Sequence, residues 1–322
     1  MKDRFCAFLF VIVFLPFLLF SQPIKKNEIP RDTSYTIYSA YKKIKKNYPF
    51  ISLIDEKLPK GVIQNKNITY KIIDQTDYGK RELKLTVFRP EDKQIYPAVL
   101  IIHGGGWSSG TPGMMNAFAQ NLCLKGFAAV CVEYRLTPEA IYPAAVDDLN
   151  DAVMWIYKNA TRYKLNKNKI AVAGFSAGGQ LASLIGTKNK DKLIKAVVNV
   201  DGITNFLEKE TIDRAEKAKR ENTKIPVDAL WLGGTFSEKS EVWKDASSVF
   251  WVTENSAPTL FICSSIPRFH NGRDEYIQNL NSFGIYSDAY TFDNCPHSFW
   301  LFSPWQSITI QKMVDFFYKI LK

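Results

Sequence analysis

The residues most suited to chemistry lie in the run Gly174-Phe175-Ser176-Ala177-Gly178. A strand-like segment, KIAVA, precedes the serine, and a segment with helical character, AGGQLASLIG, follows it. A serine in this position lies on a sharp strand-to-helix turn, where flanking glycines avoid collisions with neighbouring backbone. The start of the helix adds positive potential beside the hydroxyl oxygen. Ser176 is therefore the candidate nucleophile, and the alternative is a glycine-rich packing turn.

A second candidate is the run HGGGW at residues 103–107, directly after the apolar segment AVLIIH. Consecutive glycines let backbone N–H groups turn toward a developing oxyanion. We expect the N–H groups of Gly105, Gly106 and Ala177 to form such an oxyanion hole. A phosphate-binding loop is the alternative, but neither GKS nor GKT ends the run. His103 is expected to hold the loop by hydrogen bonds rather than to act as a base.

A third candidate is His297, in the run NCPHSFW between a strand-like segment and the last helical segment. A serine hydroxyl is a poor nucleophile at neutral pH and needs a general base. The chain has three histidines, and the other two are His103 and His270. His297 is the best placed, because a loop after the last strand can reach a nucleophile that precedes it in the chain. The alternative is a structural histidine.

An alternation of strands and helices must position these three runs. Short, wholly apolar segments recur along the chain, and helical patterns or Gly/Pro breaks separate them. These segments are AVLIIH, FAAVCVEY, KIAVAGF, KAVVNV and TLFICSS. Helices are expected at 114–125, 143–160, 177–187, 272–283 and 304–321. The alternation predicts an α/β fold with a mostly parallel sheet and helices on both faces. Upstream, NITYKII and ELKLTVF are expected to form a hairpin.

One domain, residues 67–322, accounts for this alternation. Residues 22–66 are polar and Lys-rich and are predicted to form an N-terminal arm. Residues 203–257 separate two core strands by far more than a normal connection and form an insertion. The insertion contains a charged helical piece and a Trp-rich piece, and we expect it to shape a substrate site.

Residues 1–21 have the pattern of a secretory signal peptide. Lys2 and Arg4 precede an uncharged apolar run that ends at Phe20, and the small residue Ser21 follows. A membrane anchor is the alternative, but the run is slightly short for a span. We therefore predict an exported protein, periplasmic or secreted, that is not inserted in a membrane after cleavage.

The composition excludes several other classes of protein. With 46% hydrophobic and 23% charged residues, the 322-residue chain is too apolar for a disordered polymer. The formal charge of +10 comes with scattered lysines rather than a basic motif, so no nucleic-acid partner is expected. The cysteines beyond residue 21 show no CxxC or His-rich spacing, so no metal is expected. We predict buried free thiols at these positions: Cys123, Cys131, Cys263 and Cys295.

The runs HGGGW, VEYRLTPEAIYPAAVDDLNDAVMWI, AGFSAGG and PHSFW resemble the α/β-hydrolase superfamily in order and spacing. They are similar to the hormone-sensitive-lipase-like esterases, and more so to exported bacterial esterases that remove acetyl or feruloyl groups from plant polysaccharides. The resemblance covers about residues 67–322. It implies an α/β-hydrolase fold and a Ser-His-Asp acyl-enzyme mechanism without metal or organic cofactor. It also implies an acylated oligo- or polysaccharide substrate, such as xylan or pectin.

Three alternatives to this function stay open. Lipase-like relatives often have Asp before the nucleophile, and Phe175 at this position favours the carbohydrate esterases over a lipase-like small-ester carboxylesterase. A serine peptidase or amidase of the same fold would use the same residues. A non-catalytic carbohydrate-binding protein on a hydrolase scaffold is the third.

The acid of the implied triad has more than one candidate. Relatives usually carry it just after the seventh strand, here PTLFICSS, where this chain has no carboxylate. Asp201, at the end of the preceding strand AVVNVD, is the preferred residue. Asp274 is the alternative, but Asn271 before it resembles a helix N-cap, which would make Asp274 a first-turn residue. Asp293 is a third candidate in the same loop as His297.

Aromatic and cationic residues near these runs are candidates for substrate binding. Trp107 and Trp300 could stack on pyranose rings, although packing in the core is an alternative for each. Arg268 and Arg273 could together bind a uronate carboxylate. The alternative for the arginines is a pair of surface charges on a connecting loop.

Overall fold

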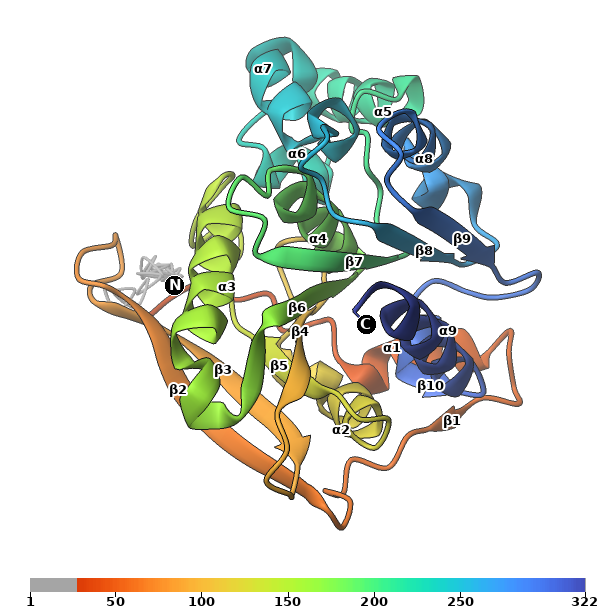
Figure 1. Ribbon diagram of the computed structural model, residues 1–322. Coiled ribbons are helices and arrows are strands. Elements are labelled where there is room, and N and C mark those ends of the chain that lie inside the picture. Colours follow the sequence, from red (N-terminus) through yellow and green to blue (C-terminus); the bar gives the residue numbers. More distant parts are fainter. Residues whose placement is uncertain (1–27, 322) are drawn as a thin grey trace, which may run out of the picture.

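An eight-stranded, mostly parallel sheet forms the centre of the protein (Figure 1). The computed structural model describes residues 28–321, so the predicted signal peptide lies outside the described residues. The strand order is β2-β3-β5-β4-β6-β7-β8-β9. The strands are β2 (Val62–Ile73), β3 (Arg81–Pro90), β4 (Tyr96–Ile102), β5 (Ala128–Val132), β6 (Leu165–Phe175), β7 (Ile194–Val200), β8 (Thr259–Cys263) and β9 (Ser287–Thr291). All neighbours from β5 to β9 are parallel, whereas β2 pairs with β3 and β3 with β5 antiparallel.

Helices cover both faces of the sheet, as the apolar strands predict. Successive residues of β4 point to opposite sides, so that Leu100 packs with one hydrophobic cluster and Ile101 with another. The first cluster includes residues of α3 (Ala144–Tyr163) and α4 (Ala177–Thr187). The second includes residues of α2 (Asn116–Cys123) and α9 (Trp305–Ile320). These helices and α8 (Arg273–Ser282) lie within a few residues of the predicted ranges.

The hairpin β2–β3 is confirmed, but β2 begins earlier than predicted. It starts at Val62, inside the range assigned to the arm. Its pairing with β3 shifts register between Asn65 and Ile68, and Asn67 between them has φ of 56°. This irregularity interrupts the alternation from which a strand is recognised in sequence.

The N-terminal arm packs against the body of the protein. Its helix α1 (Ile37–Lys45) buries Ala40 and Ile44 in the same cluster as α9. A two-residue strand, β1 (Ser52–Leu53), pairs antiparallel with β10 (Phe302–Ser303). The arm thus lies beside the C-terminal segment (Figure 1).

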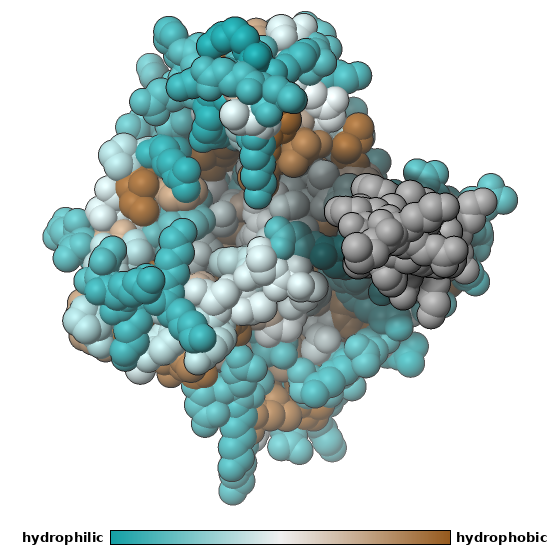
Figure 2. Space-filling view, turned by 180° about the vertical axis from the view of Figure 1, so that it is seen from behind, coloured by the Kyte–Doolittle hydropathy of each residue, from teal (hydrophilic) through white to brown (hydrophobic). Residues whose placement is uncertain are grey.

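The insertion contributes three helices near the carboxyl end of β7. They are α5 (Lys209–Arg220), α6 (Val227–Trp231) and α7 (Phe236–Ala246). Trp231 and Trp243 are fully buried and join the insertion to the first cluster. Figure 2 shows hydrophilic residues gathered at the top of the molecule, where Figure 1 places α5 and α7. The insertion therefore has an apolar inner side and a polar outer side.

The four cysteines of the described chain are buried free thiols, as predicted. Among the helices of residues 28–321, none is long and apolar enough to cross a membrane.

Candidate active site

Ser176 lies on a strained turn between β6 and α4. Its φ of 54° and ψ of −119° belong to a region that costs of order 1–3 kcal/mol for a residue with a side chain. A hydrogen bond of 2.8 Å from its N–H to the carbonyl of Val200 stabilises the turn. A Cβ atom at Gly174 would lie 1.9 Å from the carbonyl oxygen of Gly178, and one at Gly178 would lie 2.2 Å from that of Ile102. Both flanking glycines are therefore required by close backbone approach.

Ser176, His297 and Asp201 form one continuous chain of hydrogen bonds. Nε2 of His297 lies 2.8 Å from Oγ of Ser176, and Nδ1 lies 2.8 Å from Oδ2 of Asp201. Since a carboxylate only accepts, Nδ1 carries the proton, and neutral Nε2 is left to accept from the serine hydroxyl. Oδ1 of Asp201 accepts a further hydrogen bond of 2.7 Å from the N–H of Ser264. The imidazole is thus held in the tautomer that can take a proton from Ser176.

Asp201 is the carboxylate that the fold places against His297, and Asp274 is not. Asp201 is buried at the end of β7, with φ of 55°, and its N–H donates to the carbonyl of Ile262. The side chain of Asp274 is 81% exposed and accepts a hydrogen bond of 2.7 Å from Arg273. The guanidinium of Arg273 lowers the pKa of Asp274. The N-cap of α8 is Gly272, one residue after the predicted position.

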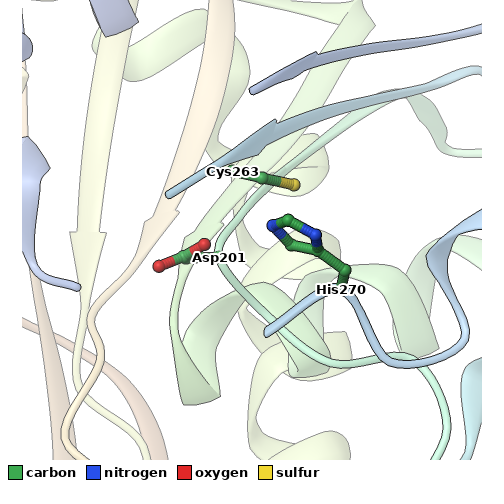
Figure 3. A group of neighbouring side chains, drawn as sticks. All are labelled: Asp201, Cys263 and His270. Atoms are coloured by element: carbon green, nitrogen blue, oxygen red, sulfur yellow. The ribbon is translucent and has the colours of Figure 1, made fainter. Parts of the chain in front are cut away.

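Three potential metal ligands, one of them the triad residue Asp201, lie close together. Donor atoms of Asp201, Cys263 and His270 fall within 4.8 Å of one another, and Figure 3 shows the three side chains converging. Burial raises the pKa of the Cys263 thiol to about 11, so it stays protonated near neutral pH. Nε2 of His270 donates to the carbonyl of Ser264 at 2.8 Å, and both oxygens of Asp201 already accept hydrogen bonds. A protonated thiol, a ring nitrogen bonded to the backbone and a carboxylate bonded at both oxygens are poor ligands for a cation.

Gly105 and Gly106, in the glycine loop (103–110) after β4, line the same cavity as Ser176 and Ala177. The carbonyl oxygen of Gly105 accepts from Ser109 twice, at 3.0 Å from N and 2.7 Å from Oγ. Because a trans peptide points its oxygen and hydrogen in opposite directions, the N–H of Gly106 is turned away from Ser109. Among residues 28–321, none accepts a hydrogen bond from the N–H of Gly105 or Gly106. Ala177 is the first residue of α4, where an N–H has no partner within the helix.

His103 supports this loop and does not reach the reacting groups. It is 1% exposed, its Nδ1 donates to the carbonyl of Gly104 at 2.8 Å, and its ring stacks on Tyr134. Burial lowers the pKa of His103 to about 4, so the ring is neutral near pH 7. These contacts match the structural role expected from the sequence.

Ser176 and His297 open into a cavity of about 810 Å³. The arm and the insertion both contribute to its wall. Apart from the triad and the glycine loop, the wall includes Tyr35, Lys43, Ile203, Glu210, Arg214, Val227, Asp228, Arg268 and Phe269. Arg214 is paired with Asp228. The sequence patterns did not indicate Tyr35, Lys43 or Phe269, because no spacing rule links them to the motifs.

Two contacts attach the arm to the loops of the site. The hydroxyl of Tyr35 lies 2.9 Å from that of Ser298, the residue after His297. Burial raises the pKa of Tyr35, which keeps its hydroxyl protonated. A β-bridge joins Asp32 to Ser109, the residue that holds the carbonyl of Gly105. The arm therefore contacts both the loop that carries His297 and the glycine loop.

The predicted substrate-binding residues divide into two groups. Trp107 and Arg268 line the cavity, although Trp107 is only 7% exposed and its Nε1 donates to Gln180 at 3.0 Å. For Trp300 and Arg273 the structure corrects the prediction. Trp300 is 1% exposed and packs its ring against His297 from within the core. Arg273 lies outside the cavity wall and bonds to Asp274 and Thr291.

Known proteins share this sequence pattern and this fold. Residues 85–282 match the family model BD-FAE. The AB hydrolase superfamily protein C1039.03 of Schizosaccharomyces pombe is 28% identical over 226 residues, which are 66% of each chain. The chain spans between 41% and 66% of the length of the first four curated relatives, several of which are named esterase, carboxylesterase or arylesterase.

Solved structures agree with the sequence comparison. The hyperthermophilic esterase from the archaeon Pyrobaculum calidifontis has a TM-score of 0.66 and 25% identity, covering 89% of this chain and 95% of that one. A truncated carbohydrate esterase from gut microbiota has a TM-score of 0.63 and 19% identity, covering 83% and 99%, and shows the fold alone. The α/β-hydrolase fold predicted from the sequence is confirmed. Since the family match spans more than half of its residues, the chain belongs to the BD-FAE family of the α/β-hydrolase superfamily.

Proposed function

We propose that this protein is a serine carboxylic ester hydrolase. The observation that supports it most strongly is the hydrogen-bonded chain from Ser176 through His297 to Asp201. Beside it are the N–H groups of Gly105 and Gly106, which donate to no other residue within the described part of the chain, 28–321. These are the nucleophile, base, orienting acid and oxyanion donors of acyl transfer, and the first three are each at hydrogen-bonding distance from the next. The esterase names of several curated relatives agree with this chemistry.

The reaction follows from the order of these groups. Oγ of Ser176 attacks the ester carbonyl while Nε2 of His297 takes its proton, and Asp201 stabilises the imidazolium. The oxyanion accepts from the N–H groups of Gly105, Gly106 and Ala177. When the tetrahedral intermediate collapses, the bond to the alcohol breaks and His297 returns the proton to the leaving oxygen. Water, deprotonated by His297, then releases the acid from the serine.

As substrate we propose an acylated oligo- or polysaccharide. A cavity of about 810 Å³ is large enough for a short acyl group together with a sugar residue. Lys43 and Arg268 line it, and among residues 28–321 neither has a carboxylate within salt-bridge distance. Glu210 is the one exposed carboxylate of the wall, so the charges favour a substrate that carries a carboxylate of its own, such as a uronate. Export of the protein, predicted from residues 1–21, would bring it to such a polymer.

The activity is tested with 4-nitrophenyl acetate and a fluorophosphonate probe. We expect the wild-type protein to hydrolyse the ester and to be labelled once, and Ser176→Ala to lose both properties. The matched control is Ser282→Ala, at the exposed end of α8, which should behave as the wild type. Turnover retained by Ser176→Ala would refute the mechanism, and an unlabelled wild-type protein would favour a non-catalytic binding role.

The substrate class is tested by measuring the products released from a panel of xylans and pectins. Acetate release would support a deacetylase, ferulate release a feruloyl esterase, and methanol release a methyl esterase. Faster cleavage of anilides than of the matching esters would instead indicate an amidase or peptidase.

A further inference from the structure

Phe269 lies face to face against the imidazole of His297. The ring centroids are 3.7 Å apart and the ring planes differ by 8°. The guanidinium carbon of Arg268 lies 4.5 Å from the centroid of the Phe269 ring. Because the imidazole already occupies one face of that ring, the guanidinium lies over the other. The three side chains form a stack that ends on the base of the proposed reaction.

Core packing does not account for this position of Phe269. The side chain is half-buried and lines the cavity, and it belongs to none of the three hydrophobic clusters in residues 28–321. It comes from the 3₁₀ turn η3 (Pro267–His270) after β8, whereas His297 belongs to the loop after β9. Two separate loops thus bring the rings together, and the imidazole is the aromatic partner of Phe269.

The hydrogen bonds of His297 leave one movement of its ring uncontrolled. The bond to Asp201 holds Nδ1, but the far end of the ring can still swing out of plane about that point. Such a swing would carry Nε2 away from Ser176. The hydrogen bond to the serine cannot prevent it throughout the reaction, because that bond is lost once the serine reacts. A flat neighbour at 3.7 Å blocks the swing on one side, and Trp300, edge-on at 5.2 Å, supports the ring from within the core.

Holding the imidazole in place bears on the reaction step rather than on binding. Nε2 of His297 must stay in line with Oγ of Ser176 while it takes the serine proton, and the flat ring at 3.7 Å maintains that line. Loss of the ring should therefore lower kcat rather than weaken substrate binding.

We propose that Phe269 is a positioning residue for His297, holding the imidazole in line with Ser176. This inference rests on the proposed ester hydrolysis and names a residue that takes no direct part in the bond changes.

The test compares Phe269→Leu, which keeps apolar volume but removes the flat ring, with Phe269→Tyr, which keeps the ring. Both are assayed on 4-nitrophenyl acetate after circular dichroism and thermal unfolding have shown that they are folded. We expect kcat of Phe269→Leu to fall roughly tenfold, with KM changed less than about twofold, and Phe269→Tyr to stay within about threefold of wild type. Phe269→Met, flexible and of similar volume, should repeat the loss and replaces the leucine variant if that one does not fold.

Each outcome decides between this role and another. A wild-type kcat in Phe269→Leu would overturn the inference, and a loss confined to KM would make Phe269 part of the substrate wall instead. An equal loss in the tyrosine variant would also overturn it, since the ring would then not be the feature that matters. If the wild-type protein neither hydrolyses the ester nor reacts with the fluorophosphonate, the proposed function itself fails.

Discussion

Oδ2 of Asp201 lies 2.8 Å from Nδ1 of His297, although the two residues follow different strands of the sheet. Asp201 is the residue directly after β7, and His297 belongs to the loop after β9. Between them lies the turn after β8, which supplies the N–H of Ser264 to Asp201 and the ring of Phe269 to His297. The turn after β8, where the sequence resemblance placed the acid, therefore supports both triad partners in this chain. The carboxyl ends of three neighbouring parallel strands meet at this point.

Replacing the triad acid should cost far more than replacing Asp274. In Asp201→Asn the amide oxygen stays with the N–H of Ser264, so the amide nitrogen faces Nδ1 of His297. Nδ1 must then be the acceptor, Nε2 carries the proton, and Ser176 loses its base. We expect kcat to fall roughly 10³- to 10⁴-fold for Asp201→Asn, and less than about twofold for Asp274→Asn. Steady-state assays on 4-nitrophenyl acetate compare the two, and the reverse order would make Asp274 the acid.

A methyl group on the nucleophile turn should destabilise the fold. The Cβ of Gly178→Ala would lie 2.2 Å from the carbonyl oxygen of Ile102 and 2.6 Å from that of His103, and neither oxygen can move without shifting the sheet end. We expect the free energy of unfolding in urea to fall by about 3 kcal/mol. Gly113→Ala is the matched control, because its nearest neighbour would be 3.7 Å away, and its change should stay within about 0.5 kcal/mol. Equal effects would show that the turn tolerates a side chain.

The sequence could predict the motifs and the layers because each depends on local rules. The apolar strands, the helix periods and the Gly-Xaa-Ser-Xaa-Gly turn each need only neighbouring residues, and from them Ser176 and His297 could be placed at one edge of the sheet. The choice of Asp201 over Asp274 needed one more rule. A carboxylate in the first turn of a helix interacts favourably with the positive end of the helix dipole, which indicates a structural role rather than contact with a distant loop.

The cavity wall could not be predicted in the same way. Tyr35 and Lys43 come from an arm far from the motifs, and only packing of α1 on the second cluster brings them to the site. In the sequence Trp300 resembles a sugar-stacking residue, but the indole is buried in the second cluster with its ring against His297. An aromatic residue beside a catalytic motif has the same pattern whether it faces a substrate or the core.

The buried histidine of the glycine loop should make stability depend on pH. In the folded state burial lowers the pKa of His103 to about 4, whereas in the unfolded chain it has the ordinary value of about 6.5. Between these pH values the imidazole of His103 is protonated in the unfolded state but not in the folded state. The free energy of unfolding therefore falls as the pH drops from about 6.5 to 4, by on the order of 3 kcal/mol in all. Above pH 6.5 the contribution is constant.

Urea unfolding of wild type and His103→Asn between pH 4 and 8 checks this dependence. Asn keeps a donor for the carbonyl of Gly104 but does not titrate, so its curve should be flatter than that of the wild type below pH 6.5, whatever its overall stability. Parallel curves for the two proteins would mean that other groups cause the acid instability.

The two arginines predicted to bind a uronate should differ in their effect on substrate. Arg268 lines the cavity and has no carboxylate partner among residues 28–321, whereas Arg273 is bonded to Asp274 and Thr291 outside the wall. Against an acetyl ester of a uronic acid, we expect Arg268→Ala to raise KM roughly tenfold, the cost of one charge-assisted hydrogen bond, while Arg273→Ala leaves KM unchanged. Against a neutral acetyl sugar, neither should alter KM.

Because Arg268 also covers Phe269, its removal can lower kcat, but that loss would be the same for both substrates. Comparing the ratio of kcat/KM between the charged and neutral esters therefore isolates recognition of the carboxylate. A ratio unchanged by Arg268→Ala would exclude uronate binding by this residue and leave it as support for the aromatic stack.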